Sequence, residues 1–149
     1  MRLTTFTDYS LRVLMFVATA PEGRATIAEV ARSFDISEHH LVKVVHALGT
    51  SGLLNNQRGR GGGLRLGRAP REINVGHVVR ITEGMDFPAE CFGRNDNHCV
   101  LTPACRLAGV LERALEAFYA VLDGYTLEDL VANRKDVTAI LHRFTPALA

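Results

Sequence analysis

Apolar residues recur every three or four positions in three segments near the start of the chain, as they do on the buried face of a helix. Residues 7–19, 25–34 and 37–48 each predict such a helix. The apolar stripe of the third segment consists of Leu41, Val44, Val45 and Leu48. About three or four residues separate the second and third segments, which is the spacing of a helix-turn-helix.

Hydroxyl and carboxyl side chains mark where these helices begin. Thr7 or Asp8 can cap the first helix, because an oxygen at this position accepts a free backbone N–H. Thr26 and Glu29 have the spacing of a capping box at the start of the second helix. Ser37 is a suitable N-cap for the third.

The next segment changes from helical to strand periodicity. Residues 53–57 and 64–66 predict two strands, and glycines at 59 and 61–63 allow the positive φ of a hairpin turn. A helix, a helix-turn-helix and a hairpin follow one another in the order of a winged helix. We therefore predict a mainly α fold with a small β-hairpin, in which residues 1–82 form a winged helix-turn-helix DNA-binding domain.

The second half predicts further helices around a loop. Residues 73–84 predict a helix, with Asn74 as a cap, and residues 85–101 have loop composition. Thr102 and the following proline can start a long helix over residues 103–122. Its apolar face consists of Leu107, Leu111, Ala114, Leu115, Phe118 and Leu122. This face predicts a dimer seam, with a further helix capped by Thr126. Residues 103–149 would then be a dimerisation helix and C-terminal helices.

Composition narrows the class of protein. A chain of 149 residues that is 47% hydrophobic can bury the core of one domain. It contains no run of 18 apolar residues for a membrane span and no secretory signal at its start. The three cysteines are clustered and odd in number, which favours thiolates in a reducing cytoplasm over a disulfide framework. We therefore expect a cytoplasmic protein.

The net charge of +1 hides an asymmetry between the two halves. Residues 1–71 hold ten basic and five acidic side chains (+5), whereas residues 72–149 hold seven and eleven (−4). A basic front half suggests a polyanionic partner, although an unevenly charged surface would give the same balance.

The outward residues of the third helix suit double-stranded DNA. Once the apolar stripe is buried, this helix presents Glu38, His39, His40, Lys43 and His46. The hairpin region adds five arginines within fourteen residues that contain no acid: Arg58, Arg60, Arg65, Arg68 and Arg71. Arginine at a thin glycine-rich tip fits a narrow minor groove. The predicted DNA-binding residues are Ser37, His39, His40, Lys43, Arg58 and Arg60. A nucleotide-binding loop is disfavoured, because no Gly-Lys-Ser/Thr follows the glycines.

The cysteines Cys91, Cys99 and Cys105 have the spacing C-x7-C-x5-C. Structural zinc sites generally contain a tighter pair, whereas longer spacings suit a bulkier iron–sulfur cluster. If Thr102 caps the helix, Cys105 is its third residue, where the helix dipole favours a thiolate. A zinc-stabilised structural protein and merely reactive thiols remain alternatives. An enzyme is disfavoured, because the chain has no C-x-x-C motif and no Ser/His/Asp arrangement above chance.

The segments "MRLTTFTDYSLR", "HHLVKVVHALG", "RGRGGGLRLG", "VVRITEG" and "CVLTPACRL…AFYAVLDGYTLEDLV" resemble the winged-helix iron–sulfur repressors. The likeness extends to about residue 133 and is strongest to the nitric-oxide-sensing branch of that family. It implies a homodimer that binds a palindromic operator while it holds a 4Fe–4S cluster (favoured over 2Fe–2S) and releases DNA when nitric oxide attacks the iron. The cluster would be bound within residues 83–105.

The resemblance also implies a fourth ligand. In this branch an N-terminal aspartate of the other protomer can complete the site, and Asp8 in "TTFTDYS" matches it. A carboxylate is a hard ligand beside soft thiolates, so its iron would be the most open to attack. His98, Glu90, Asp96 or solvent are alternatives. Because the cysteine spacing is also similar to that of the iron-responsive branch, iron remains an alternative signal to nitric oxide.

Overall fold

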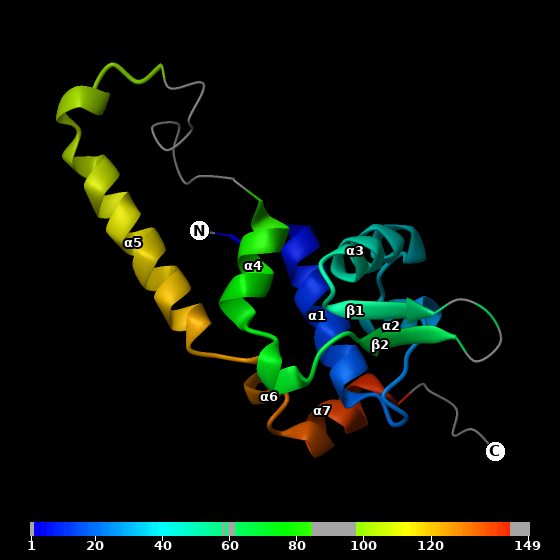
Figure 1. The fold of residues 1–149 in the computed structure, drawn as a ribbon. Helices are drawn as coiled ribbons and strands as arrows, with labels where there is room; N and C mark the ends of the chain where they lie inside the picture. Colours follow the sequence, from blue (N-terminus) through cyan, green and yellow to red (C-terminus); the bar gives the residue numbers. More distant parts are fainter. Residues whose placement is uncertain (1, 58, 60–61, 85–97, 144–149) are drawn as a thin grey trace.

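The structure, a computed structural model, describes residues 2–57, 59, 62–84 and 98–143, and it is mainly helical with one small hairpin (Figure 1). The predicted fold class is therefore confirmed. In chain order the elements are α1 (Thr5–Thr19), α2 (Ile27–Phe34), α3 (Glu38–Thr50), β1 (Leu54–Gln57), β2 (Gly63–Leu66), η1 (Pro70–Glu72), α4 (Val75–Glu83), η3 (Thr102–Ala104), α5 (Arg106–Asp123), α6 (Leu127–Leu130) and α7 (Arg134–Leu141).

Helix α1 is the centre of the fold and packs against α3, β2, α4, α6 and α7. Its second half is apolar on nearly every side, so the residues from 16 to 20 are buried without a break. The helix begins one turn earlier than predicted. Thr4 is the N-cap, and its Oγ1 accepts a hydrogen bond from the Thr7 N–H at 3.2 Å. The predicted cap at Thr7 or Asp8 is wrong, because both residues already lie in the first turn of α1.

The helix-turn-helix follows the predicted pattern. The capping box is present: Thr26 Oγ1 accepts from the Glu29 N–H at 3.2 Å, and Glu29 Oε2 accepts from the Thr26 N–H at 2.6 Å. Asp35 ends α2 in a left-handed conformation (φ 53°) and turns the chain towards α3. The predicted stripe of α3 is buried. Ser37 occupies the N-cap position of α3, but its side chain makes no capping hydrogen bond.

The hairpin is joined to the helices at its base. Strands β1 and β2 are antiparallel, with Leu54 opposite Leu66 and both central residues of each strand paired in register. Leu64 also exchanges two backbone hydrogen bonds with Ala25, at 2.7 and 3.0 Å, just before α2. Gly63 has φ 148°, and a Cβ at this position would lie 2.8 Å from the Ala25 carbonyl oxygen. A glycine is therefore required where the wing meets the helix-turn-helix.

The long helix of the second half starts later than predicted. Residues Thr102–Ala104 form a 3₁₀ turn, and Cys105 is extended (φ −77°, ψ 108°) at the N-cap of α5. The placement of Cys105 as the third helical residue is therefore wrong. The predicted caps further along are confirmed, since Asn74 accepts from His77 N–H and Thr126 accepts from Asp129 N–H. The predicted loop at 85–101 lies largely outside the described residues.

After α5 the chain returns to the core. Leu127, Val131 and Leu141 are buried in the same hydrophobic cluster as α1, and Ser33 of α2 donates to the Leu141 carbonyl oxygen at 2.5 Å. Figure 1 shows α6 and α7 below α1, while α5 stands away from the helix-turn-helix as an arm (Figure 1). Residues from both halves of the sequence therefore build one core.

Candidate functional site

The polar face of α3 is exposed along its length. His39, His40 and Lys43 all lie on the surface, as do Glu38 and His46. None of these side chains contributes to the core, because the core contacts of α3 come from its buried stripe. The first two turns of α3 therefore offer imidazole and ammonium groups, which can donate hydrogen bonds to phosphates or base edges.

A groove of about 460 Å³ separates α3 from the hairpin. Val42, Val45 and His46 line it on the helix side, and Asn56, Gln57 and Leu64 line it on the hairpin side. Asn56 also fixes the two walls to each other, since its Nδ2 donates to the Val45 carbonyl oxygen at 3.1 Å. The helix and the hairpin thus form two separate ridges with a fixed relative position.

The arginines near the hairpin have different roles. Arg58 and Arg60 lie outside the described residues. Arg65 points its Nη1 to the carbonyl oxygens of Glu22 and Gly23, at 3.3 and 3.5 Å, and so supports the turn between α1 and α2. Sequence reasoning missed Arg24, whose Nη1 reaches the Gly62 carbonyl oxygen at 3.4 Å beside the hairpin. No local pattern points to this role, because the contact depends on where the hairpin packs.

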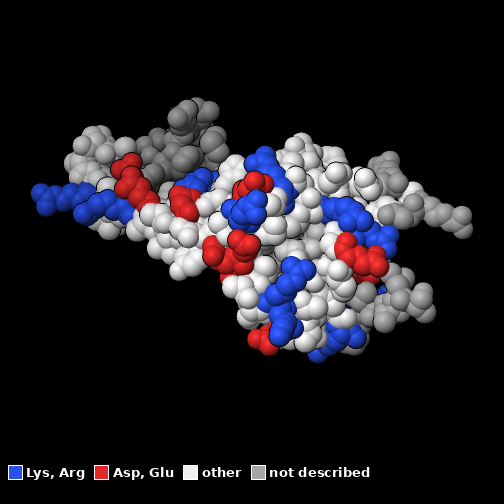
Figure 2. Space-filling model, turned by 60° about the horizontal axis from the view of Figure 1, so that its bottom comes forward, with Lys and Arg blue, Asp and Glu red and all other residues white. Residues whose placement is uncertain are grey.

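Figure 2 brings the α6 and α7 side of the molecule forward and shows acidic and basic side chains mixed over it, without a continuous patch of either sign among the described residues. The described part of this side therefore offers no basic surface for a polyanion.

Two of the three cysteines are the ends of one small turn. Thr102 Oγ1 and N both donate to the Cys99 carbonyl oxygen, at 2.8 and 3.2 Å, and Cys105 follows the 3₁₀ residues directly. Both cysteines are partly exposed. Cys105 still lies at the start of a helix, although as its N-cap and not as its third residue.

Asp8 has a partner within its own helix. Its Oδ1 accepts from Arg12 Nε at 3.0 Å, and its Oδ2 lies 2.8 Å from Arg12 Nη2. The carboxylate is 44% exposed, so a further cation could also reach it. The Arg12 guanidinium in turn lies 5.6 Å from the ring centroid of Phe34 at the end of α2. Sequence reasoning did not identify Arg12, although its spacing of four from Asp8 is that of a helical ion pair.

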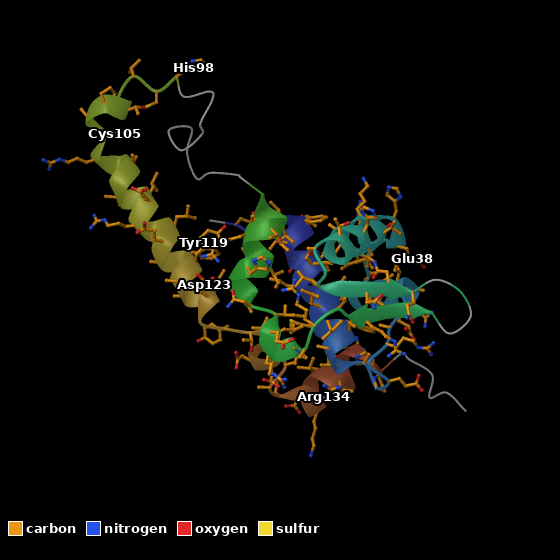
Figure 3. The ribbon with its side chains drawn as sticks, in the orientation of Figure 1. Glu38, His98, Cys105, Tyr119, Asp123 and Arg134 are labelled. Atoms are coloured by element: carbon orange, nitrogen blue, oxygen red, sulfur yellow. The ribbon has the colours of Figure 1, made fainter. Side chains whose placement is uncertain are left out.

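One chain does not bring the predicted ligands together. Figure 3 shows His98 and Cys105 at the outer end of α5, well away from α1 (Figure 3). Cys91 and the alternative ligands Glu90 and Asp96 lie outside the described residues. Within the part of the chain that the structure describes, no three His, Cys, Asp or Glu residues are grouped to hold a metal ion.

Helix α5 exposes apolar residues that its own chain does not cover. No residue of α5 is buried, and Leu107, Val110 and Val121 are 61%, 50% and 62% exposed. Leu111 and Leu115, on the predicted apolar face, are partly covered. Across the residues described, no helix is both long and apolar enough to cross a membrane. An uncovered apolar helix face of this kind is typical of a protein–protein contact.

Comparisons with known proteins agree with this geometry. The profile of the Rrf2 family, described as iron-dependent transcriptional regulators, matches residues 3–133. The HTH-type transcriptional regulator NsrR of Bacillus subtilis (strain 168) is 50% identical over 142 residues, which cover 95% of this chain and 97% of that protein. The NsrR regulator of Geobacillus kaustophilus (strain HTA426) is 49% identical with the same coverage.

Solved structures show the same fold. CymR of B. subtilis, described as its global cysteine regulator, is 29% identical with a TM-score of 0.66, over 89% of this chain and 98% of that chain. IscR of T. potens has a TM-score of 0.72 over 100% of this chain and 94% of that chain. At 24% identity, the likeness to IscR supports the fold alone.

Proposed function

Because the chain belongs to the Rrf2 family of iron-dependent transcriptional regulators, we propose that it is a homodimeric repressor that holds an iron–sulfur cluster and releases its operator in response to nitric oxide. It is a DNA-binding transcriptional regulator and not an enzyme, as the sequence predicted. The proposal concerns its signal, its cluster and its assembly.

The exposed polar face of α3 beside the hairpin is the observation that carries operator binding in this proposal. In a helix-turn-helix the first turns of the second helix enter the major groove. Ser37, His39, His40 and Lys43 occupy these turns and are exposed. The hairpin stands across the groove, and Arg58 and Arg60 belong to the sequence that joins its two strands, so we expect them to contact the neighbouring minor groove. Reading two half-sites requires two copies of this surface.

The second copy is proposed to pair along α5. Leu107, Val110 and Val121 are separated by three and eleven residues, about one and three helical turns, and so lie on one side of α5. Burial of such residues against the same face of a partner removes apolar surface from water, at roughly 25 cal/mol per Å². The partly covered residues Leu111 and Leu115 continue this seam towards α4.

The residues present fit an iron–sulfur cluster. Cys91, Cys99 and Cys105 would supply three soft thiolate ligands, and one small turn separates Cys99 from Cys105. Asp8 of the partner would supply a fourth, harder ligand. When bound, the cluster supplies iron that can react with nitric oxide. Asp8 can return to Arg12 when it no longer binds iron, because that pair already exists within one chain.

A second candidate signal is iron itself. The family description names iron dependence, and the cysteine spacing alone suits either signal. In that case scarcity of iron would empty the site and release DNA without nitric oxide. The two signals predict the same ligands but different triggers, so one experiment can separate them.

The test uses protein purified without oxygen and duplexes selected from a random-sequence library. We expect brown protein whose absorbance bleaches with nitric oxide while fluorescence anisotropy reports DNA release. Release by an iron chelator at the same rate without nitric oxide would favour the iron-responsive candidate. Bleaching with unchanged DNA affinity would contradict cluster control of binding. Colourless protein with stoichiometric zinc would contradict the cluster altogether.

A further inference from the structure

Within the described residues, the arm formed by α5 packs against α4. Figure 3 shows Tyr119 and Asp123 on the part of α5 nearer α4, and Cys105 at the opposite end (Figure 3). The contact that joins the arm to the domain is therefore close to the last turn of α5. We call the contact between α4 and the last turn of α5 the joint. Its geometry determines the direction of α5 relative to the winged helix.

An ion pair with two parallel contacts lies at the joint. Arg80 of α4 places its Nη1 2.5 Å from Asp123 Oδ1 and its Nη2 2.7 Å from Asp123 Oδ2. The same guanidinium lies 4.3 Å from the ring centroid of Tyr119, one helical turn earlier on α5. A planar guanidinium that is both forked onto a carboxylate and stacked on a ring has little freedom to rotate. The pairing lowers the pKa of Asp123 and raises that of Arg80.

Two hydrogen bonds to backbone carbonyl oxygens, at and just after Asp123, complete the joint. Asn74 Nδ2 donates to the Asp123 carbonyl oxygen at 2.8 Å, and the Val75 N–H donates to the Tyr125 carbonyl oxygen at 2.9 Å. A Cβ on Gly76 would lie 3.0 Å from both Asp123 Cγ and Asp123 N, in addition to a closer clash with Oδ1. Gly76 therefore permits an approach that no larger residue would allow.

The joint contributes little to stability, because the side chains of Arg80 and Asp123 are 44% and 43% exposed. Its effect on the direction of α5 is larger than its effect on stability. Eighteen residues of α5 extend about 27 Å from the joint, at about 1.5 Å per residue. A rotation of about 10° at the joint would therefore move the far end of α5 by about 5 Å, which exceeds the rise of one base pair, about 3.4 Å.

We propose that Arg80, with Asp123 and Tyr119, is a positioning cluster that fixes the angle between α4 and α5 and thereby sets the half-site spacing that the dimer accepts. The inference rests on the proposed function, because it requires two chains paired along α5. None of the three residues is proposed to touch DNA. They act through the direction of the helix that joins the two winged domains.

The test compares wild-type protein with Arg80→Gln, Asp123→Asn and Tyr119→Leu, all as cluster-loaded full-length dimers. The probes are the selected duplex, versions with its half-sites one base pair closer or further apart, and a single half-site. We expect wild-type protein to prefer one spacing and the variants to lose about three- to tenfold of that preference. Affinity for the single half-site should stay unchanged, and Arg80→Lys should lie between wild type and Arg80→Gln.

Lys135→Gln on α7 is the matched control, because it also removes one exposed positive charge but lies away from the joint. An equal loss of affinity on all duplexes would identify a merely structural role and overturn the inference, as would an unchanged spacing profile. If Arg80→Gln fails to fold, Tyr119→Leu carries the same test without touching the ion pair. Wild-type protein that binds no selected duplex would instead overturn the proposed function.

Discussion

Asp8 has one partner in its own chain, Arg12, and a second, proposed partner in the cluster of the other chain. It lies in the first turn of α1, where the free N–H groups favour a negative charge, and it is already paired with Arg12. A role as helix cap is taken by Thr4 instead, which leaves the Asp8 carboxylate available to other groups. The pair with Arg12 is half-exposed, so Arg12 competes only weakly with a metal ion for the Asp8 carboxylate.

We predict that Asp8→Ala weakens the coupling between cluster and DNA but leaves the cluster bound by the three thiolates. The ratio of DNA affinities with and without cluster should fall about tenfold, within the usual range of coupling energies. Asp136→Ala is the control, because Asp136 also lies in the first turn of a helix. Visible absorbance reports the cluster and anisotropy reports the DNA. A coloured Asp8→Ala protein with the affinity ratio of wild type would contradict this role, and a colourless one would contradict binding of the cluster by the three thiolates alone.

His142 is the second residue with a clear physical consequence. Its ring packs against Phe16 in a tilted arrangement, with a centroid distance of 4.2 Å and an interplanar angle of 48°, and its Nε2 lies 3.0 Å from Thr19 Oγ1. Burial lowers the pKa of His142 below its ordinary value of 6.5, and Arg134 acts in the same direction while Glu29 opposes it. The unfolded chain therefore binds more protons than the folded chain at mildly acidic pH.

We predict that the free energy of unfolding is higher above about pH 6.5 and falls as the pH drops through the lowered pKa of His142. Urea unfolding midpoints at about pH 7.5 and about pH 5.5 measure the difference. His142→Gln should reduce this pH dependence. His77→Gln, which changes an exposed histidine of α4, should leave it as in wild type. The same slope in all three proteins would exclude His142 as its source.

At the scale of elements, the sequence was most informative where capping and periodicity agree. Thr26 and Glu29 correctly marked α2, and the stripe of α3 was fully predicted, because both signals are local. The start of α5 was wrong for the same reason. Thr102 and the next proline have the composition of a helix start, but the Thr102 hydroxyl bonds back to Cys99 and closes a separate turn. Cys105 then becomes the break between two helices.

We predict that Lys43→Ala on α3 weakens binding to the selected duplex by about 5- to 100-fold, if Lys43 contacts a base edge. A phosphate contact would instead lower affinity equally on specific and random DNA and reduce the salt dependence. Lys135→Ala on α7 serves as the control for loss of one exposed charge. Unchanged anisotropy titrations with Lys43→Ala would remove this residue from the interface.

We predict that Val121→Lys on α5 raises the dimer dissociation constant by about 100-fold or more, because it places a charge in an apolar seam. Val121 is 62% exposed in one chain, so the fold of the chain itself should tolerate the change. Ile140→Lys on α7, where Ile140 is 63% exposed, is the matched control. Sedimentation equilibrium gives the dissociation constants. An equally stable dimer in both variants would place the seam elsewhere.

At the scale of the molecule, the winged helix is completed by residues far away in sequence. Periodicity predicted one buried face for α1, whereas the structure buries this helix on nearly all sides. The difference comes from α6 and α7, which cover α1 through Leu127 and Leu141. Local patterns cannot show such docking, since it depends on where the chain returns. The ligand site was likewise predicted only as a set of residue types, because α1 and Cys105 lie apart in one chain (Figure 3).

We predict that Leu141→Ala lowers the free energy of unfolding of the DNA-binding part by about 2–5 kcal/mol, as truncation of a buried leucine generally does. Ile140→Ala, next to it but exposed, should cost less than about 0.5 kcal/mol. Urea denaturation of both variants gives the comparison. Equal stability of the two variants would mean that α7 is not part of the cooperative core.

The first turn of α1 and the last turn of α4 are fastened together. Glu83 Oε1 accepts from the Thr4 N–H at 2.8 Å and from its hydroxyl at 3.1 Å, and Thr7 Oγ1 donates to Thr82 Oγ1 at 2.9 Å. The start of α1 and the end of α4 therefore lie next to each other, on the side of the molecule away from α7 (Figure 1). A bulky or charged side chain introduced at Thr4 would therefore disturb α1 and α4 together.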